Sequence, residues 1–309
     1  INIVVAGATG YVGLDLVYLL SKHPNAKIVN LCAQRNIGKN INLFDKRIKK
    51  KLPKISNINK VNWNKIDLLY LSLPNGEAQK VINKTIKYRS LKFIDLSADF
   101  RLTSAKIYKE TYGTNHKAKN LIDKSIYAIS EFVKTKIKNY RIISNPGCYP
   151  TSIQLPLIPL IKKKIINANG ITIDSKSGYS GAGKKFNKKF VHKNIYSSVY
   201  AYSTQKHRHM SELDQEFTKV SPTKIKYTFN PHLLPTFRGI LSSIYLETRA
   251  SYNANKITKI LKAFHKKNKF VKVLNTNSSI GSGNVINTNY CEISVSQTRY
   301  KNKIVIFSA

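Results

Sequence analysis

One cysteine of this 309-residue chain stands in a setting that would make its thiol reactive. Cys148 lies in Asn145-Pro146-Gly147-Cys148-Tyr149-Pro150-Thr151, where Gly147 permits a sharp turn and Pro150 suits the first turn of a helix. The free N–H groups and dipole of a helix N-terminus stabilise a thiolate, which is then nucleophilic near neutral pH. We therefore predict that Cys148 is a catalytic nucleophile, whereas Cys32 and Cys291 are expected to be buried, inert cysteines.

Two histidines could transfer a proton beside such a thiolate. His207 and His209 stand in Gln205-Lys206-His207-Arg208-His209, shortly before Glu212 at an expected helix start. Side chains two residues apart on an extended segment point the same way, so spacing does not choose between them, and His207 is favoured only slightly. No further ligand cluster accompanies the pair and the three cysteines are widely spaced, so no metal site is expected.

A glycine-rich segment near the N-terminus is typical of a dinucleotide-binding loop. It follows an apolar strand at residues 1–6 and opens a helix, so its backbone can approach a pyrophosphate closely. The next strand ends in Cys32-Ala33-Gln34-Arg35, without the carboxylate that usually binds the ribose 2′-hydroxyl of NAD and with an arginine for a 2′-phosphate. NADP(H) is therefore favoured over NAD, and the expected cofactor-binding residues are Gly7, Thr9, Gly10, Tyr11, Val12, Gly13 and Arg35.

Two cationic side chains follow segments where an anionic ligand could dock. Arg101 comes after Asp95-Leu96-Ser97-Ala98-Asp99-Phe100, at the end of an expected parallel strand, and could hold a phosphate through two hydrogen bonds. Lys184 closes Ser177-Gly178-Tyr179-Ser180-Gly181-Ala182-Gly183, a run that is typical of a loop approaching a ligand. Both residues are candidates for binding a phosphate group.

The elements that must position these residues change character near Pro146. Before it, apolar strands alternate with helical stretches at residues 11–21 and 77–86, which predicts a Rossmann-like, doubly wound parallel sheet. After it, longer strand-like runs with helical patterns at 211–218 and 255–266 predict an α+β domain with a mostly antiparallel or mixed sheet. We expect an NADP-binding domain over 1–147 and a catalytic, substrate-binding domain over 148–309. Pro156 is expected to end the helix after Cys148 early.

The composition points to a soluble, cytoplasmic protein. The chain has 42% hydrophobic residues, no apolar run long enough to span a membrane, no signal-peptide pattern, and an odd number of cysteines that suits a reducing compartment. Its formal charge of +38 would suit a nucleic-acid-binding protein without catalysis, which is the alternative from a different class. However, only 9 of the 53 basic residues are arginines, and the lysines are spread along the chain, so no specific nucleic-acid partner is expected.

Taken together, these motifs resemble N-acetyl-γ-glutamyl-phosphate reductase, an enzyme family of arginine biosynthesis that is related to the aspartate-semialdehyde dehydrogenases. The resemblance implies an NADPH-dependent oxidoreductase that converts N-acetyl-γ-glutamyl phosphate to N-acetylglutamate 5-semialdehyde. The thiolate of Cys148 would attack the acyl phosphate and form a thioester, which hydride from NADPH would reduce. The resemblance runs nearly end to end, over residues 7–13, 95–101, 112–116, 127–131, 145–151, 177–184, 207–213 and 231–240.

The same resemblance implies roles for further residues. The related dehydrogenases place their catalytic histidine after an Arg-x-x-Gly-like segment, which here reads Arg238-Gly239-Ile240, so that role moves to His207 or His209. It also implies a homo-oligomer, a tetramer or a dimer, formed through the second domain, with the extreme C-terminus returning to the first. Aspartyl phosphate and N-acetyl-aminoadipyl phosphate remain alternative substrates. Ser180 and Gly181 are expected to contact the cofactor, and the expected substrate-binding residues are Arg101, Asn145, Lys184, Arg208 and Arg238.

Overall fold

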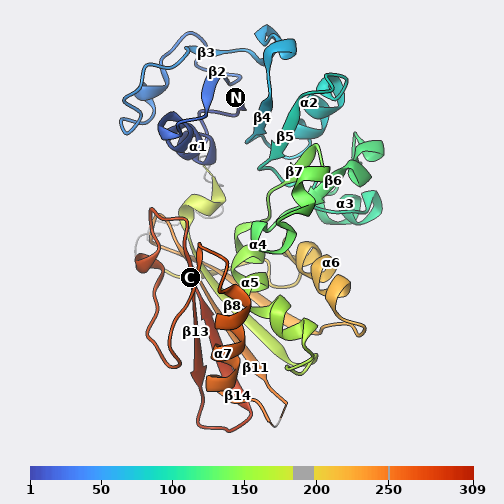
Figure 1. The fold of residues 1–309 in the computed structure, drawn as a ribbon, viewed down its shortest axis with the longest axis vertical. Coiled ribbons are helices and arrows are strands. Elements are labelled where there is room, and N and C mark those ends of the chain that lie inside the picture. The colour runs from blue at the N-terminus through green and yellow to red at the C-terminus, as the bar shows by residue number, and fades with distance from the viewer. Residues whose placement is uncertain (184–197, 250) are drawn as a thin grey trace. The chain divides into compact units, whose positions relative to one another are not determined.

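The computed structural model describes residues 1–183, 198–249 and 251–309. The chain divides into two compact units, Ile1–Pro146 and Gly147–Ala309, and each unit contains one seven-stranded sheet (Figure 1). In the described residues, no helix is both long enough and apolar enough to cross a membrane.

The first unit contains the predicted doubly wound parallel sheet. Its strand order is β3-β2-β1-β4-β5-β7-β6, and every neighbouring pair is parallel. The strand order reverses at β1, which pairs with β2 on one side and β4 on the other, and ligands bind such sheets at this kind of switch point. The strands are β1 Asn2–Ala6, β2 Lys27–Cys32, β3 Ile55–Ser56, β4 Leu68–Leu71, β5 Lys92–Asp95, β6 Ser125–Tyr127 and β7 Ile142–Ser144.

Helices cover both faces of this sheet because successive strand residues point to opposite sides. Val4 and Ala6 of β1 belong to the buried cluster that contains α2, whereas Ile3 and Val5 belong to the cluster that contains α1. The helices of this unit are α1 Tyr11–Lys22, α2 Glu77–Thr85, α3 Ala105–Tyr112 and α4 Ser130–Val133. The continuous apolar run of β1 is therefore explained by burial on both faces.

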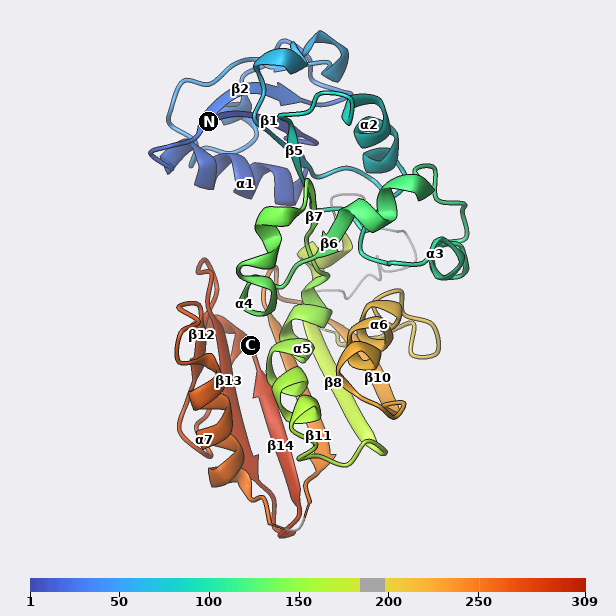
Figure 2. The same cartoon turned by 45° about the vertical axis from the view of Figure 1, so that its right-hand side comes forward.

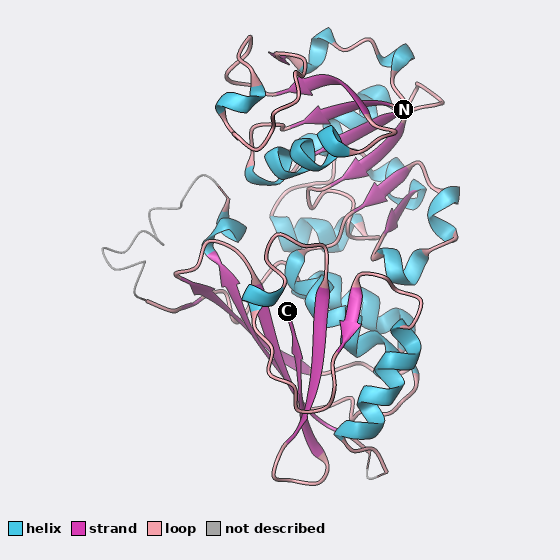
Figure 3. Cartoon of the chain, turned by 60° about the vertical axis from the view of Figure 1, so that its left-hand side comes forward, coloured by secondary structure: helices cyan, strands magenta, loops and turns pink. Residues whose placement is uncertain are grey.

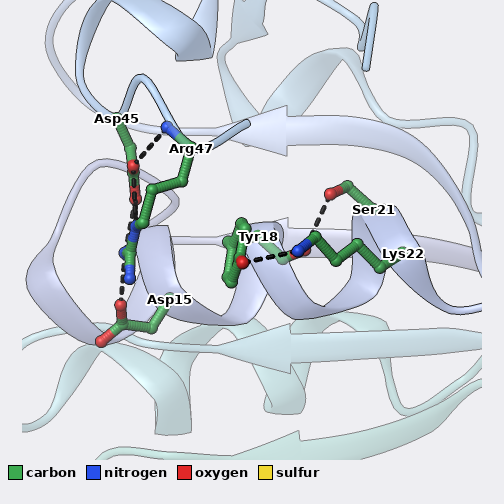
Figure 4. Close-up of polar contacts among 6 residues, drawn as sticks. All are labelled: Asp15, Tyr18, Ser21, Lys22, Asp45 and Arg47. Atoms are coloured by element: carbon green, nitrogen blue, oxygen red, sulfur yellow. Dashed lines mark hydrogen bonds and ion pairs between the residues drawn. The ribbon is translucent and has the colours of Figure 1, made fainter. Parts of the chain in front are cut away.

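An arginine fastens the long segment after β2 to the outer side of α1. Arg47 donates hydrogen bonds to Asp45 in its own segment and to Asp15 on α1, each at 2.6 Å, and its guanidinium lies 4.8 Å from the ring centre of Tyr18 (Figure 4). Hydrogen bonds to Asp45 and then to Asp15 raise the pKa of Arg47 above its usual value. This contact fixes the chain that leads away from the carboxyl end of β2.

The second unit contains a mixed sheet, as predicted. The order is β12-β13-β14-β11-β8-β10-β9; the pairs β12–β13 and β8–β10 are parallel and the others are antiparallel. Ala309 exchanges two backbone hydrogen bonds with Glu292, so the last residues lie in this sheet. The strands are β8 Ile171–Gly178, β9 Tyr200–Ala201, β10 Tyr227–Leu234, β11 Ile240–Glu247, β12 Val271–Val273, β13 Cys291–Gln297 and β14 Lys303–Ser308.

Three helices of this unit lie along one face of its sheet (Figures 2 and 3). They are α5 Cys148–Lys162, α6 Met210–Val220 and α7 Ala254–His265. A buried hydroxyl chain joins α5 to the sheet, because the oxygen of Ser242 lies 2.8 Å from that of Ser152 and 2.7 Å from that of Ser175. These directional contacts fix how α5, which begins at Cys148, sits on β8 and β11.

The expectation that Pro156 ends this helix early is wrong. The helix continues through Pro156 and Pro159 to Lys162, and its side chains from Tyr149 to Ile161 are buried on almost every side. Pro159 has no N–H for the carbonyl of Leu155, but Nε2 of His265 on α7 donates to that oxygen at 3.0 Å. Pro156 likewise has no N–H for the carbonyl of Ser152. Burial of the helix therefore outweighs the hydrogen bonds lost at both prolines, and His265 replaces the one lost at Pro159.

His265 should therefore contribute measurably to stability. Its Nδ1 accepts from the side-chain amide of Asn268 at 2.9 Å, which leaves Nε2 as the donor. We expect His265→Leu to lower the free energy of unfolding by about 1–3 kcal/mol, because the buried carbonyl of Leu155 loses its partner. Urea denaturation followed by circular dichroism measures the change. The exposed His23→Leu is the control, and an equal effect of both substitutions would show that the replacement donor is unimportant.

Candidate active site

The predicted cofactor loop lies at the carboxyl end of β1, between β1 and α1. The backbone N–H groups of Gly7 and Ala8 donate to the carbonyl of Cys32, at 2.8 and 3.2 Å. Because Ala6 is paired with Cys32, the ends of β1 and β2 meet at one edge of the sheet. Arg35, which is exposed, follows at the same edge, so the structure brings it to the strand end beside the glycine loop.

The shape of this loop fits a dinucleotide. Gly7 has φ 81°, and a Cβ there would lie 2.0 Å from the backbone oxygen of Ser72; one on Gly13 would lie 2.1 Å from the oxygen of Gly7. The N-cap residue Gly10 offers no side-chain cap, and the first turn of α1 contains no acidic residue. The positive end of α1 is thus suited to an anion such as a pyrophosphate. Thr9, Tyr11 and Val12 complete the loop, and Val12 is 53% exposed.

Two buried carboxylates build the segment that follows β5. Asp95 accepts hydrogen bonds from the backbone N–H and hydroxyl of Ser97 and from the N–H of Phe100, and burial raises its pKa to about 6. Asp99 accepts from the N–H groups of Gly76 and Gln79, at 2.7 and 3.2 Å, and so caps α2. Because both carboxylates accept hydrogen bonds from backbone N–H groups, the loop that leads to Arg101, the predicted anion-binding residue, has a defined conformation.

Arg101, at the end of that loop, is only 8% exposed. Its Nε donates to the carbonyl of Asn145 at 2.9 Å, and the N–H of Asn145 donates to the carbonyl of Asp95 at 2.8 Å. The first unit therefore brings together two predicted substrate-binding residues, Arg101 and Asn145. Their contact with a substrate stays a prediction.

Cys148 is the first residue of α5 and is exposed, as expected for a nucleophile at a helix N-terminus. Two side chains from the start of α6 and its N-cap approach Gly147, the residue before this terminus. The N–H of Gly147 donates to Oε2 of Glu212 at 2.9 Å, and a Cβ on Gly147 would lie 2.7 Å from Nε2 of His209. The structure therefore places His209 and Glu212 directly against the residue that precedes Cys148.

The other two cysteines differ from Cys148. Cys32 is buried, as predicted, and burial raises the pKa of its thiol to about 11, which disfavours the reactive thiolate. Cys291 is half-buried rather than buried; it is the first residue of β13, and its sulfur is 3.3 Å from the hydroxyl of Ser308.

The two predicted histidines have different environments. His209, the N-cap residue of α6, is buried, and its Nε2 lies 3.9 Å from Oε1 of Glu212. His207 lies among aromatic rings, with ring centres 5.6 Å from Tyr149 and 5.4 Å from Phe229, and its Nδ1 accepts the N–H of His209 at 3.1 Å. Burial, reinforced by the charge of the exposed Arg208, lowers the pKa of His207 to about 4.

Tyrosines that sequence reasoning did not single out hold the histidine segment in place. The hydroxyl of Tyr149 donates to the carbonyl of His232 at 3.2 Å and lies 3.1 Å from the hydroxyl of Tyr202. The N–H of Tyr202 donates to the carbonyl of Pro231, so the chain just before His207 is attached to β10. Burial raises the pKa of both tyrosines, which therefore stay protonated. The one sequence signal for Tyr149 is its position directly after Cys148.

Two loops at the ends of β8 and β10 carry further predicted residues. Ser180 and Gly181 lie in the short 3₁₀ helix Tyr179–Ala182, and the N–H of Ser180 donates to the carbonyl of Phe237 at 2.9 Å. Arg238 follows directly, with its guanidinium 5.0 Å from the ring centre of Phe237. These three predicted residues are thus brought together, whereas Lys184 falls outside the described residues.

Within the described part of the chain, no group of three or more His, Cys, Asp and Glu side chains is arranged to hold a metal ion. The chemistry that this arrangement supports is that of an exposed thiol on a helix N-terminus, with a histidine and a carboxylate packed against Gly147, the preceding residue. In the first unit, the glycine loop after β1 has a shape suited to binding a dinucleotide.

Family comparisons agree with this division of the chain. A family model described as the NAD binding domain of semialdehyde dehydrogenases matches residues 2–140, which confirms the expectation of a nicotinamide cofactor. A second model, described as their dimerisation domain, matches residues 148–309. The crystal structure of aspartate semialdehyde dehydrogenase II from Vibrio cholerae superimposes with a TM-score of 0.72 at 16% identity, covering 99% of this chain and 92% of that one. This similarity confirms the fold.

Curated relatives are more similar in sequence. An N-acetyl-gamma-glutamyl-phosphate reductase of Afipia carboxidovorans is 38% identical over 308 residues, which cover 98% of this chain and 88% of that protein. A probable chloroplastic N-acetyl-gamma-glutamyl-phosphate reductase of Oryza sativa is 36% identical over 309 residues, or 100% of this chain and 74% of that protein. These relatives confirm the resemblance on which the expected roles rest. The chain therefore belongs to the N-acetyl-γ-glutamyl-phosphate reductases, within the wider family of semialdehyde dehydrogenases.

Proposed function

We propose that this chain reduces N-acetyl-γ-glutamyl phosphate to N-acetylglutamate 5-semialdehyde, with NADPH as reductant and Cys148 as nucleophile. The observation that carries the proposal is the exposed thiol of Cys148 at the start of α5, with His209 packed against Gly147. The named activity of the relatives, which match the chain over its whole length, supports the same substrate.

The reaction begins with attack of the Cys148 thiolate on the acyl carbon. The bond from that carbon to the phosphate oxygen breaks, inorganic phosphate leaves with the electron pair, and a thioester forms. NADPH, when bound, supplies the hydride that the thioester carbon accepts. His209 gives a proton to the oxygen of the resulting thiohemiacetal and takes it back as the carbon–sulfur bond breaks, which releases the aldehyde and restores the thiolate.

The remaining predicted residues bind and orient the reactants. The glycine loop after β1, with Thr9, Tyr11 and Val12, would hold the pyrophosphate, and Arg35 the 2′-phosphate that distinguishes NADPH from NADH. Ser180 and Gly181 are proposed to contact the same cofactor. The cationic and amide side chains proposed to bind the substrate are Arg101, Asn145, Lys184, Arg208 and Arg238.

We also propose a homo-oligomer, either a dimer or a tetramer, that works in the cytoplasm. The dimerisation-domain match supports self-association of residues 148–309. On β11, Ile244 is buried beneath the helices, whereas its neighbour Tyr245 is 45% exposed on the opposite face of the sheet. We propose that this opposite face is the contact surface between subunits. A reducing compartment is required because Cys148 must remain a thiol.

The function can be tested in the reverse direction. Mixing the protein with N-acetylglutamate semialdehyde, phosphate and NADP⁺ should raise the absorbance of reduced nicotinamide, and Cys148→Ser should lower the rate on the order of 10³-fold or more, because the hydroxyl is a far weaker nucleophile. Cys291→Ser is the matched control and should keep the rate.

Aspartate semialdehyde and N-acetyl-aminoadipate semialdehyde are compared in the same assay. A preference for either would contradict the proposed substrate. Undiminished turnover by Cys148→Ser would contradict the proposed nucleophile.

The two histidines should respond differently to substitution. We expect His209→Asn to lower kcat by about 10²–10³-fold, because it removes the proton donor. The asparagine oxygen in His207→Asn can still accept the N–H of His209, so we expect a loss of at most about tenfold. With a pKa near 4, His207 does not change charge between pH 5 and 8, so His207→Asn should keep the wild-type pH profile there. A larger loss from His207→Asn than from His209→Asn would reverse the assignment.

Arg35 should set the preference for the phosphorylated cofactor. We expect Arg35→Ser to raise the KM for NADPH by about 10–100-fold, because a charge-assisted hydrogen bond to the 2′-phosphate is lost, while the KM for NADH changes little. Arg89→Ser, at another exposed arginine of the same unit, is the control. Initial rates with each cofactor give the two constants, and equal changes in both would rule out a 2′-phosphate contact.

A further inference from the structure

A cavity of about 480 Å³ lies where α5 and α6 end, in the second unit. Its walls come from the last turn of α5, from the segments that follow α5 and α6, and from the chain that follows β11. Cys148 begins α5 and His209 is the N-cap residue of α6, so the cavity lies at the other ends of these two helices. Because α5 contains 15 residues, it separates the cavity from Cys148 by about 20 Å. The cavity is therefore distinct from the candidate active site.

The lining of this cavity combines an apolar surface with two cations. The apolar surface comes from the buried side chains of Ile161, Ile166 and Ile225. Lys164 and Arg249, which are both exposed, also line the cavity, and no described carboxylate lines it beside them. Cationic groups beside an apolar surface suit a ligand that has an anionic group and a hydrocarbon part.

Lys164 reaches the cavity from a backbone conformation that disfavours lysine. Its φ is 55°, its N–H donates to the carbonyl of Ile161 at 2.8 Å, and the N–H of Ile165 donates to that of Leu160 at 3.1 Å. Glycine is the usual residue at this position of such a helix end, and asparagine is the usual replacement. Asparagine indeed occupies three of the six described non-glycine residues with positive φ. Lysine at this position is explained by a role for its ammonium group in the cavity.

The two helix ends do not cancel the positive charge of the lining. The C-terminal end of a helix carries about half a negative charge, which favours cations nearby. Two full positive charges exceed the partial charges of α5 and α6 together. Some of the last carbonyls are also paired already, since Leu160 and Ile161 accept backbone N–H groups on α5, and Phe217 accepts the N–H of Ser221 on α6. The lining therefore stays positive and attracts an anion.

We propose that this cavity binds a small organic anion, with a phosphate or carboxylate against Lys164 and Arg249 and a hydrocarbon part on the three isoleucines. Backbone hydrogen bonds already fix the walls, because the N–H of Arg249 donates to the carbonyl of Ile165 at 3.0 Å and that of Asn167 to Glu247 at 2.9 Å. Binding thus requires little ordering of the chain. The site does not depend on the proposed function, so a chain without turnover would still bind the anion.

Isothermal titration calorimetry of the full chain with hexyl phosphate and with hexanoate tests the site. We expect a Kd of about 1 mM or lower for at least one of them, and the tighter probe identifies the anionic group. Inorganic phosphate lacks the hydrocarbon part and hexanol lacks the charge, so each should bind at least about tenfold more weakly. Binding of neither anionic probe would overturn the proposal, as would inorganic phosphate or hexanol binding equally well.

Paired substitutions locate the bound probe. Lys164→Asn with Arg249→Gln removes both cations, and asparagine tolerates the positive φ, so we expect binding to weaken at least about tenfold. Lys163→Asn with Arg89→Gln removes the same charge from exposed residues outside the cavity and should change the Kd less than about twofold. Equal weakening by both pairs would show only general attraction to a chain of charge +38. Loss of binding in folded Arg101→Gln would place the probe in the candidate active site, and either result would overturn the proposal.

Discussion

The absence of a side chain at residue 147 is the constraint on which the arrangement around Cys148 depends. His209 occupies the space where a Cβ would stand, and Glu212 takes the backbone N–H of the same residue. Both contacts require α6 to pack closely against the first turn of α5. Gly147 has φ −66° and ψ 156°, a conformation that any residue can adopt, so glycine is required here for the close approach of His209 and not for the turn. Any larger residue would move the imidazole or the helix, and the geometry around Cys148 would be lost.

The groups around each ring distinguish the two histidines, although their spacing makes them look equivalent. Both rings lie in the same segment, yet His207 is enclosed by aromatic rings that disfavour its charged form, whereas His209 faces a carboxylate. The nitrogen of His207 that accepts the N–H of His209 fixes the backbone of its neighbour. His207 thus helps to position His209 through this hydrogen bond.

The sequence was sufficient to predict what depends on local pattern. The parallel sheet follows from apolar runs such as β1, and the exposed thiol follows from the turn before Cys148. Interactions between distant segments could not be predicted. The persistence of α5 past Pro156 and Pro159 depends on burial and, at Pro159, on a donor from His265, which lies 110 residues from its acceptor in the sequence. For the same reason, the sequence marks Glu212 only as part of a helix start. An acidic residue in the first turn of a helix is ordinary, and only the fold shows that Gly147 lies against it.

The acidic residues of this chain show how a strongly basic composition can coexist with a specific site. The sequence contains only 15 Asp and Glu residues against 53 Lys and Arg, yet Asp95, Asp99 and Glu212 are fully buried and all accept backbone N–H groups. A surface acid can be replaced by lysine or asparagine with little loss of stability, because water solvates either side chain. A buried acid that accepts backbone N–H groups cannot be replaced in this way. Its loss leaves a backbone donor unsatisfied, and its exchange for lysine buries an unpaired charge. Substitution that enriches the surface in lysine is therefore expected to leave in place the carboxylates that shape the loop before Arg101 and the start of the Cys148 helix.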